Sequence, residues 1–161
     1  MDREQLSLCF LKKDNQFLLI NRNFPPFMGQ WNAVGGHKLP DESIYDCAIR
    51  EIYEETNILV QKVELVATFT WNYDNGLGFI FITDLDNNIK IQDYPKTTIE
   101  GLLDFKSMEW IEHPKNTGII DDIKLFLIDI YQKKIRNVHY HLTYDRNRLM
   151  QVDKQTGLCM Q

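Results

Sequence analysis

The chain has 161 residues, a length that fits a single domain with a sizeable core. It carries 18 Lys and Arg residues against 23 Asp and Glu residues, which gives a formal net charge of −5. This acidic balance argues against a protein that grips a nucleic-acid polymer or an anionic membrane through basic side chains. Three cysteines without metal-like spacing favour a reducing compartment, and no apolar run reaches the roughly 18 residues of a membrane span. We therefore expect a cytoplasmic protein, monomeric or homodimeric, with one domain at 1–152 and a disordered tail at 153–161.

Short apolar segments separated by turn residues predict a strand-rich chain. A turn at 13–16 joins the first two strands into a hairpin, Asn75-Gly76 separates a second pair, and the last two strands close another hairpin. The segment 21–30, which contains two consecutive prolines, is expected to be a loop. In chain order the strand candidates are 6–11, 17–20, 31–34, 63–71, 77–83, 89–92, 106–111, 138–143 and 148–152.

Two segments predict helices, at about 43–56 and at 119–133. The first lacks Gly and Pro, and its apolar residues at Ile44, Ala48 and Ile52 have helical spacing. Asp41 or Ser43 is the expected N-cap. Because strands outnumber helices and separate the two of them, the sequence predicts an α/β fold with a mixed sheet and helices on its faces.

The first predicted helix carries an unusual cluster of acidic residues. Glu51, Glu54 and Glu55 are spaced i, i+3 and i+4, so their carboxylates share one face of the helix. Like charges at this spacing repel one another, and a bound divalent cation would remove the cost. Oxygen ligands at this density suit Mg²⁺ or Mn²⁺. The alternative interpretation is a solvated acidic face without a ligand.

The residues around this cluster form a recognisable pattern. From Gly36 to 58 the chain reads G-x5-E-x7-R-E-I-x-E-E-x-N-I. It resembles the signature of the Nudix hydrolases, G-x5-E-x7-R-E-U-x-E-E-x-G-U, in which U is apolar, and six of the seven fixed residues match. The one departure is Asn57, which stands where the family has Gly. Asn is the best substitute for Gly in the left-handed conformation that ends many helices, so this change should cost little stability.

The resemblance implies an α/β/α sandwich with a loop-helix-loop metal site, and hydrolysis of a diphosphate linked to another group. It implies that Glu51, Glu54 and Glu55 bind Mg²⁺ or Mn²⁺ together with the carbonyl oxygen of Gly35. Gly36 and Glu42 would support the loop and helix, and Arg50 would orient the carboxylates, unless it is a solvated helix arginine. Glu100, in the loop expected at 94–105, is a candidate ligand or base, or else a surface residue. The candidate catalytic residues are Glu54, Glu55, Arg50 and Glu100.

A looser resemblance points to the MutT-like 8-oxo-dGTP diphosphatases within this family. The run Q-W-N-A-V-G-G at 30–36 is similar to R-W-N-G-F-G-G in animal members, whose Asn binds the purine. Asn32 would play that part here, and Asp121 and Asp122 resemble a pair of acids that reads the base. The alternatives are a turn-capping Asn and two acids at a helix N-terminus. The further candidates for the base pocket are Trp71 or Phe27, which would stack on the base or else belong to the core, and Ser7.

These patterns together predict a metal-dependent enzyme with a small-molecule nucleotide as substrate. The expected reaction converts a nucleoside triphosphate into the monophosphate and pyrophosphate, with oxidised purine nucleotides such as 8-oxo-dGTP preferred. Within the same family the alternative substrates are ADP-ribose, a nucleotide sugar, a dinucleoside polyphosphate and capped RNA. A nucleotide sensor without catalysis is less consistent with the sequence, because all three helix carboxylates are present. A purely structural α/β domain is disfavoured by the match to the signature.

Overall fold

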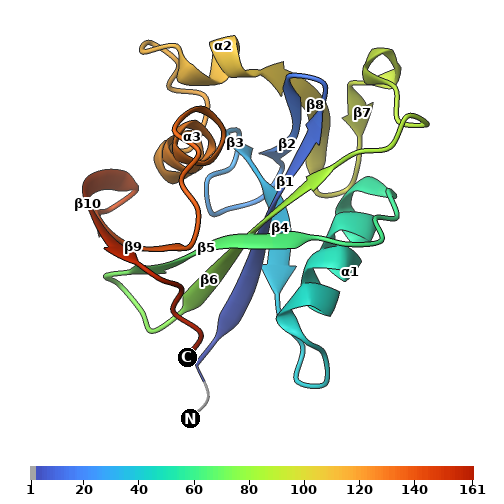
Figure 1. The fold of residues 1–161 in the computed structure, drawn as a ribbon. Coiled ribbons are helices and arrows are strands. Elements are labelled where there is room, and N and C mark those ends of the chain that lie inside the picture. The colour runs from blue at the N-terminus through green and yellow to red at the C-terminus, as the bar shows by residue number, and fades with distance from the viewer. Residues whose placement is uncertain (1–2) are drawn as a thin grey trace.

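The computed structural model describes residues 3–161, in which strands and short helices alternate (Figure 1). The strands are β1 (Gln5–Lys13), β2 (Gln16–Arg22), β3 (Trp31–Asn32), β4 (Val34–His37), β5 (Glu64–Trp71), β6 (Leu77–Asp84), β7 (Lys96–Thr97), β8 (Gly101–Ser107), β9 (Val138–Asp145) and β10 (Arg148–Thr156). The α-helices are α1 (Ile44–Thr56), α2 (Met108–Glu112) and α3 (Asp121–Leu127), with a 3-10 turn η1 (Ile91–Asp93) and a π turn η2 (Ile128–Gln132).

One mixed sheet contains all of these strands, in the order β10-β9-β5-β6-β1-β2-β8-β7, with β3 beside β2 and β4 beside β1. One edge of strand β1 pairs with two strands: its first half is antiparallel to β4 and its end is antiparallel to β2. The pairs β1–β6 and β5–β9 are parallel, and the other pairs are antiparallel. Consequently, the predicted mixed sheet and its three hairpins are confirmed.

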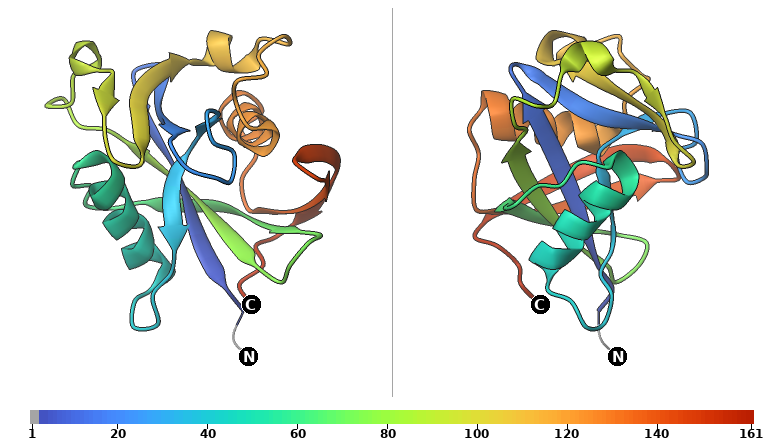
Figure 2. Two further views of the ribbon diagram at one scale, coloured as in Figure 1. Left: turned by 180° about the vertical axis from the view of Figure 1, so that it is seen from behind. Right: turned by 90° about the vertical axis from the view of Figure 1, so that its right-hand side faces the viewer.

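Helices α1 and α3 lie on opposite faces of the sheet, as the views in Figures 1 and 2 agree. Two apolar cores follow from this arrangement, since side chains alternate between the faces of a strand. On β1, Phe10 packs in the core beneath α3, whereas Cys9 and Leu11 pack in the core beneath α1. The molecule is thus an α/β/α sandwich of the predicted kind. None of the helices within residues 3–161 is long and apolar enough to cross a membrane.

Several element boundaries differ from the sequence predictions. The strand expected at 106–111 is wrong in its second half: β8 stops at Ser107, whose side chain caps α2 by accepting from the Trp110 amide at 3.2 Å. The strand expected at 89–92 is a 3-10 turn, and the helix expected at 119–133 changes to a π turn after Leu127. Strand β10 continues to Thr156, beyond the domain boundary expected at 152, because residues up to 156 pair with β9.

Candidate active site

Helix α1 presents the acidic cluster, and both of its ends are fixed by capping residues. At the start, the Ser43 hydroxyl accepts from the Asp46 amide at 3.0 Å, so Ser43 is the N-cap. At the end, Asn57 adopts the left-handed conformation expected of it, with φ 60° and ψ 20°. The helix buries Ile44, Cys47, Ala48 and Ile52 against the sheet. The phase of this apolar face fixes which way the acidic residues point.

The two glycines of β4 lie where a side chain would collide with the site. A Cβ on Gly36 would lie 2.4 Å from the carboxyl carbon of Glu51, and a Cβ on Gly35 would lie 2.0 Å from the Ser7 carbonyl oxygen. Gly35 and Gly36 pair with Leu8 and Ser7 of β1. Only glycine therefore allows β4 to run between β1 and the carboxylates of α1.

Arg50 connects the loop before α1 to the acidic cluster. Its guanidinium donates two hydrogen bonds to the Glu42 carboxylate, from Nε at 2.9 Å and from Nη2 at 2.6 Å. Nη1 donates to Glu51 at 2.8 Å and to Glu54 at 3.2 Å, and Nη2 also reaches the His37 carbonyl at 3.1 Å. Hydrogen bonds from Arg50, with a further one from the Leu39 amide, hold the pKa of Glu42 at about 2 against the opposing effect of burial. The solvated-arginine alternative does not fit this network.

Glu55 lies deeper than the other two carboxylates of the cluster. Its Oε1 accepts from the Gly35 amide at 3.3 Å. Burial, with a smaller contribution from the carboxylates of Glu51 and Glu100, raises the pKa of Glu55 to about 8, against the opposing effects of the Gly35 amide and of Arg22. Glu100 thus lies within electrostatic range of the cluster, although it comes from the loop between β7 and β8 and is exposed.

The donor set fits a divalent cation in an open site. Three carboxylates of α1 and the backbone of Gly35 would offer hard oxygen ligands, and the largely buried Glu55 has no cationic side chain bonded to it among residues 3–161. In the same part of the chain, no three His, Cys, Asp or Glu side chains form a compact ligand cage. Mg²⁺ commonly keeps waters and bridges to substrate phosphates, so a cage is not required.

Arg22 is a residue of this region that the sequence analysis missed. It ends β2 beside Gly101, and its Nε donates to the carbonyl oxygens of Phe24 at 3.3 Å and Pro26 at 2.9 Å. Since it lowers the pKa of Glu55, its positive charge lies near the acidic cluster. No local motif marks Arg22, because only the pairing of β2 with β8 brings it to the site.

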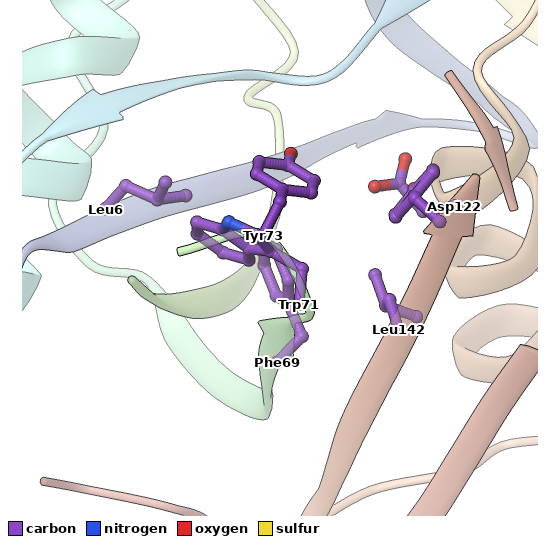
Figure 3. A pocket seen from close by; sticks show the side chains of 7 residues that line it. Leu6, Phe69, Trp71, Tyr73, Asp122 and Leu142 are labelled. Atoms are coloured by element: carbon purple, nitrogen blue, oxygen red, sulfur yellow. The ribbon is translucent and has the colours of Figure 1, made fainter. Parts of the chain in front are cut away.

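Trp71 and Asp122, two of the candidates for base binding, line a common cavity of about 120 Å³ on the α3 face of the sheet (Figure 3). Trp71 ends β5 and Asp122 belongs to the first turn of α3. Burial raises the pKa of Asp122 to about 6, and a nearby Tyr144 hydroxyl partly opposes this. The remaining lining residues are Leu6, Phe69, Tyr73, Leu142 and Tyr144.

The other base-pocket candidates lie outside the wall of this cavity. The expectation that Ser7 faces the pocket needs correction: Leu6 lines the cavity, so its neighbour Ser7 points to the α1 face, where its hydroxyl lies 3.4 Å from the Gly36 carbonyl. Asn32 accepts from the amide of Ala33 at 2.8 Å, which is the turn-capping alternative, while its amide nitrogen remains a possible donor. Phe27 packs against the core beneath α3.

Strand β3 joins the acidic cluster to this cavity. The Trp31 amide donates to the Gly118 carbonyl at 2.8 Å, and the Ile120 amide donates to the Trp31 carbonyl at 3.1 Å. The start of α3, with Asp121 and Asp122, is therefore fixed to the strand that precedes Gly35 and Gly36. One continuous stretch of backbone holds both halves of the candidate site.

Comparison with known proteins identifies the family. The model of the NUDIX domain matches residues 3–122, about three quarters of the chain. The chain belongs to the Nudix hydrolase family. Among solved structures, a MutT protein from Bacillus halodurans covers 94% of this chain with a TM-score of 0.73 at 23% identity. That likeness identifies the Nudix fold, in agreement with the mixed sheet and the loop-helix-loop arrangement described above.

Curated Nudix relatives match shorter parts of the chain. The NAD-capped RNA hydrolase NudC from Vibrio parahaemolyticus is 28% identical over 88 residues, which are 52% of this chain and 32% of that protein. The Nudix hydrolase YvcI from Bacillus subtilis is 32% identical over 88 residues, 50% of this chain and 54% of the relative. An ADP-ribose pyrophosphatase from Methanocaldococcus jannaschii is 33% identical over 60 residues, covering 37% of this chain and 36% of the relative. The chain thus spans about a third to a half of the length of these relatives.

Proposed function

We propose that this Nudix protein is a Mg²⁺- or Mn²⁺-dependent nucleoside triphosphate pyrophosphohydrolase that prefers oxidised purine nucleotides such as 8-oxo-dGTP. The observation that carries the proposal is the Arg50 network, which holds Glu51 and Glu54 on the same helix face as the buried Glu55. A solvated acidic helix would need neither the bidentate clamp on Glu42 nor a largely buried carboxylate.

In the proposed reaction, water adds across the anhydride bond between the α and β phosphates, which releases the monophosphate and pyrophosphate. When bound, the metal would neutralise the phosphoryl oxygens and lower the pKa of the attacking water. Glu51, Glu54, Glu55 and the Gly35 carbonyl would hold it, and Arg50 would keep the first two carboxylates in position. One of the carboxylates of Glu54, Glu55 and Glu100 would accept the proton from water.

The preference for a purine nucleotide rests on the second half of the site. Asp122 and Trp71 line a cavity that β3 connects to the glycines of β4. A largely buried carboxyl group suits the polar edge of a base, and the other aromatic rings of the cavity wall suit its flat face. We place the enzyme in the cytoplasm because its three cysteines are free thiols, two of them buried. We further propose that it is a monomer or homodimer.

A panel of substrates assayed with Mg²⁺ tests this function. The panel contains 8-oxo-dGTP, dGTP, dATP, ADP-ribose, a dinucleoside polyphosphate and NAD-capped RNA. We expect the highest kcat/KM with 8-oxo-dGTP, equal amounts of monophosphate and pyrophosphate, and no turnover after chelation of the metal. Faster turnover of ADP-ribose, the dinucleoside polyphosphate or capped RNA would contradict the substrate assignment. Calorimetric binding of nucleotides without any product would instead indicate a sensor.

A further inference from the structure

Two buried polar atoms in the cavity beside α3 are left without hydrogen-bond partners. They are the indole Nε1 of Trp71 and the hydroxyl oxygen of Tyr144, and neither has a partner within residues 3–161. A third buried atom of this kind, Oδ1 of Asp129, lies 3.4 Å from the ammonium group of Lys133. The cavity therefore contains two buried donors that make no hydrogen bond of good geometry within the described chain, although the Tyr144 hydroxyl lies beside the Asp122 carboxyl. Buried polar groups are nearly always paired in native proteins, so two such donors in the wall of one cavity indicate that a ligand supplies the missing acceptor.

The surrounding structure keeps both donors in place. Asn72 holds the backbone of Tyr144 on both sides: its amide nitrogen donates to the Tyr144 carbonyl at 3.0 Å, and its oxygen accepts from the Tyr144 amide at 2.8 Å. The ring of Trp71 packs beside those of Phe69 and Tyr73, with centroid separations of 5.5 and 6.0 Å. The donors are thus rigidly held in the wall of the cavity.

A carboxyl group completes the polar lining of the cavity. Asp122 extends from α3 toward the ring of Tyr73 (Figure 3). The Tyr144 hydroxyl lies beside the Asp122 carboxyl and lowers its pKa as a hydrogen-bond donor does, although the two groups do not meet the full geometry of a hydrogen bond. Leu6, Phe69 and Leu142 supply the apolar remainder. The volume of about 120 Å³ is close to that of cavities that bind one aromatic ring.

We propose that Trp71 and Tyr144 determine base specificity by donating hydrogen bonds to a carbonyl oxygen of the base, while Asp122 binds an adjacent ring N–H. A carbonyl oxygen has two lone pairs and can accept from both donors, whereas a ring nitrogen has one. The preferred class is therefore a base with a carbonyl group next to a ring N–H, such as guanine, hypoxanthine or 8-oxoguanine. Adenine lacks this edge. The inference rests on the proposed function only in taking the ligand to be a nucleotide.

The test measures binding of product-like monophosphates by calorimetry in the presence of Mg²⁺, so that no turnover is needed. One ligand is GMP and the other is 2-aminopurine riboside monophosphate, which lacks both the carbonyl oxygen and the adjacent ring N–H. We expect the protein to bind GMP at least about 10-fold more tightly, because the analogue leaves buried donors unpaired. The variants Tyr144→Phe and Trp71→Phe should each reduce this preference to about 3-fold or less.

Tyr140→Phe is the matched control on the same strand. The Tyr140 hydroxyl is buried but paired, since it donates to Asp129 at 3.0 Å. Its loss should lower the melting temperature and leave the GMP preference intact, whereas Tyr144→Phe should lower the preference without lowering the melting temperature. Equal binding of the two ligands, no detectable GMP binding, or a preference that survives in Tyr144→Phe would each overturn the inference. Absence of triphosphate hydrolysis with an intact GMP preference would contradict the proposed function alone.

Discussion

At the scale of single residues, Glu54 offers the cleanest separation of chemistry from stability. Its side chain is 56% exposed and makes one ion pair, with Arg50 at 3.2 Å. An exposed pair of this kind contributes less than about 0.5 kcal/mol. We expect Glu54→Gln to keep the free energy of unfolding within about 0.5 kcal/mol of wild type and to lower kcat at least about 100-fold, since a metal ligand or proton acceptor is lost.

Steady-state kinetics and urea denaturation of the same preparation check this prediction. Glu109→Gln is a suitable control, because Glu109 is an exposed acid of α2. Near-normal turnover by Glu54→Gln would remove Glu54 from the candidate ligands.

Asp122 gives a prediction about pH. Burial raises its pKa to about 6 in the folded protein, above the usual 3.8. The folded state therefore binds the proton more tightly than the unfolded state, and the stability from this group is complete below about pH 4 and lost as the pH rises through about 6. Asp122→Asn, which carries no charge, should be more stable than wild type at pH 7.5 by up to about 3 kcal/mol.

The check is a series of denaturation curves between pH 4 and pH 8. The stability advantage of Asp122→Asn should shrink to nothing at about pH 4. Asp121→Asn should show no such gain, because Asp121 is exposed and its charge lies favourably at the N-terminus of α3. A gain that is equal at all pH values would show that burial of the Asp122 charge is not its cause.

At the scale of elements, local sequence patterns predicted the helix and caps of the signature segment at 36–58, whereas long-range strand pairing determined the cavity. The spacing of Glu51 and Glu54 with Arg50 on one helix, and the left-handed Asn57 after it, depend on neighbours in sequence. The cavity depends on β5 pairing in parallel with β9, which brings Trp71 opposite Leu142 across about seventy residues of sequence. No local pattern in the sequence predicts that β5 pairs in parallel with β9.

Smaller errors have equally physical causes. Neighbouring residues of a strand point to opposite faces of the sheet, so an error of one residue assigns a side chain to the wrong face. Ser7 therefore lies toward α1, whereas its neighbour Leu6 lines the cavity. The apolar residues at 108–111 fit a strand or a helix equally well. The Ser107 hydroxyl caps the first turn at this position and so favours the helix α2. Capping was therefore the more informative signal at that position.

Arg50 links the loop before α1 to the helix itself. Replacing the Arg50 side chain should therefore destabilise the loop and misplace the carboxylates of the helix. Arg50→Met leaves Glu42, whose side chain is only 14% exposed, without its cationic partner. We expect a loss of about 2–3 kcal/mol in the free energy of unfolding at pH 7 and a fall in kcat/KM. The pKa of Glu42 is lowered to about 2, so its contribution is present above its usual value of 4.5 and lost as the pH falls toward 2.

Thermal denaturation of wild type and Arg50→Met at several pH values tests this prediction. The difference between wild type and Arg50→Met should be constant above about pH 5 and should shrink in acid. The exposed Arg148→Met on β10 serves as the control and should match wild type throughout. If Arg50→Met were as stable as wild type at pH 7, the clamp on Glu42 would not hold the loop.

At the scale of the whole molecule, a buried charge is one of the contacts that attach the C-terminal hairpin to the layer of α3. Asp129 of η2 is fully buried, and its Oδ2 accepts from the Tyr140 hydroxyl at 3.0 Å and lies 2.6 Å from the ammonium group of Lys154 on β10. Lys133 lies 3.4 Å from the other oxygen and is more exposed, at 59% against 36% for Lys154. Lys154 lies past the boundary expected at 152, so a residue after 152 pairs with this buried charge.

Removing one partner of a buried ion pair is costly, because the remaining charge stays in a poorly solvated place. We expect Lys154→Met to lower the free energy of unfolding by about 2–3 kcal/mol, and Lys133→Met by less than about 1 kcal/mol, since its ion pair is longer and more exposed. Combining Lys154→Met with Asp129→Asn should cost less than the sum of the single changes, because the neutral amide no longer leaves an unpaired charge and can still accept from Tyr140. Urea denaturation of wild type, the two single variants Lys154→Met and Asp129→Asn, and their double variant at pH 7 measures this coupling. Additive losses would mean that β10 is not attached to the layer of α3 through the Asp129 charge.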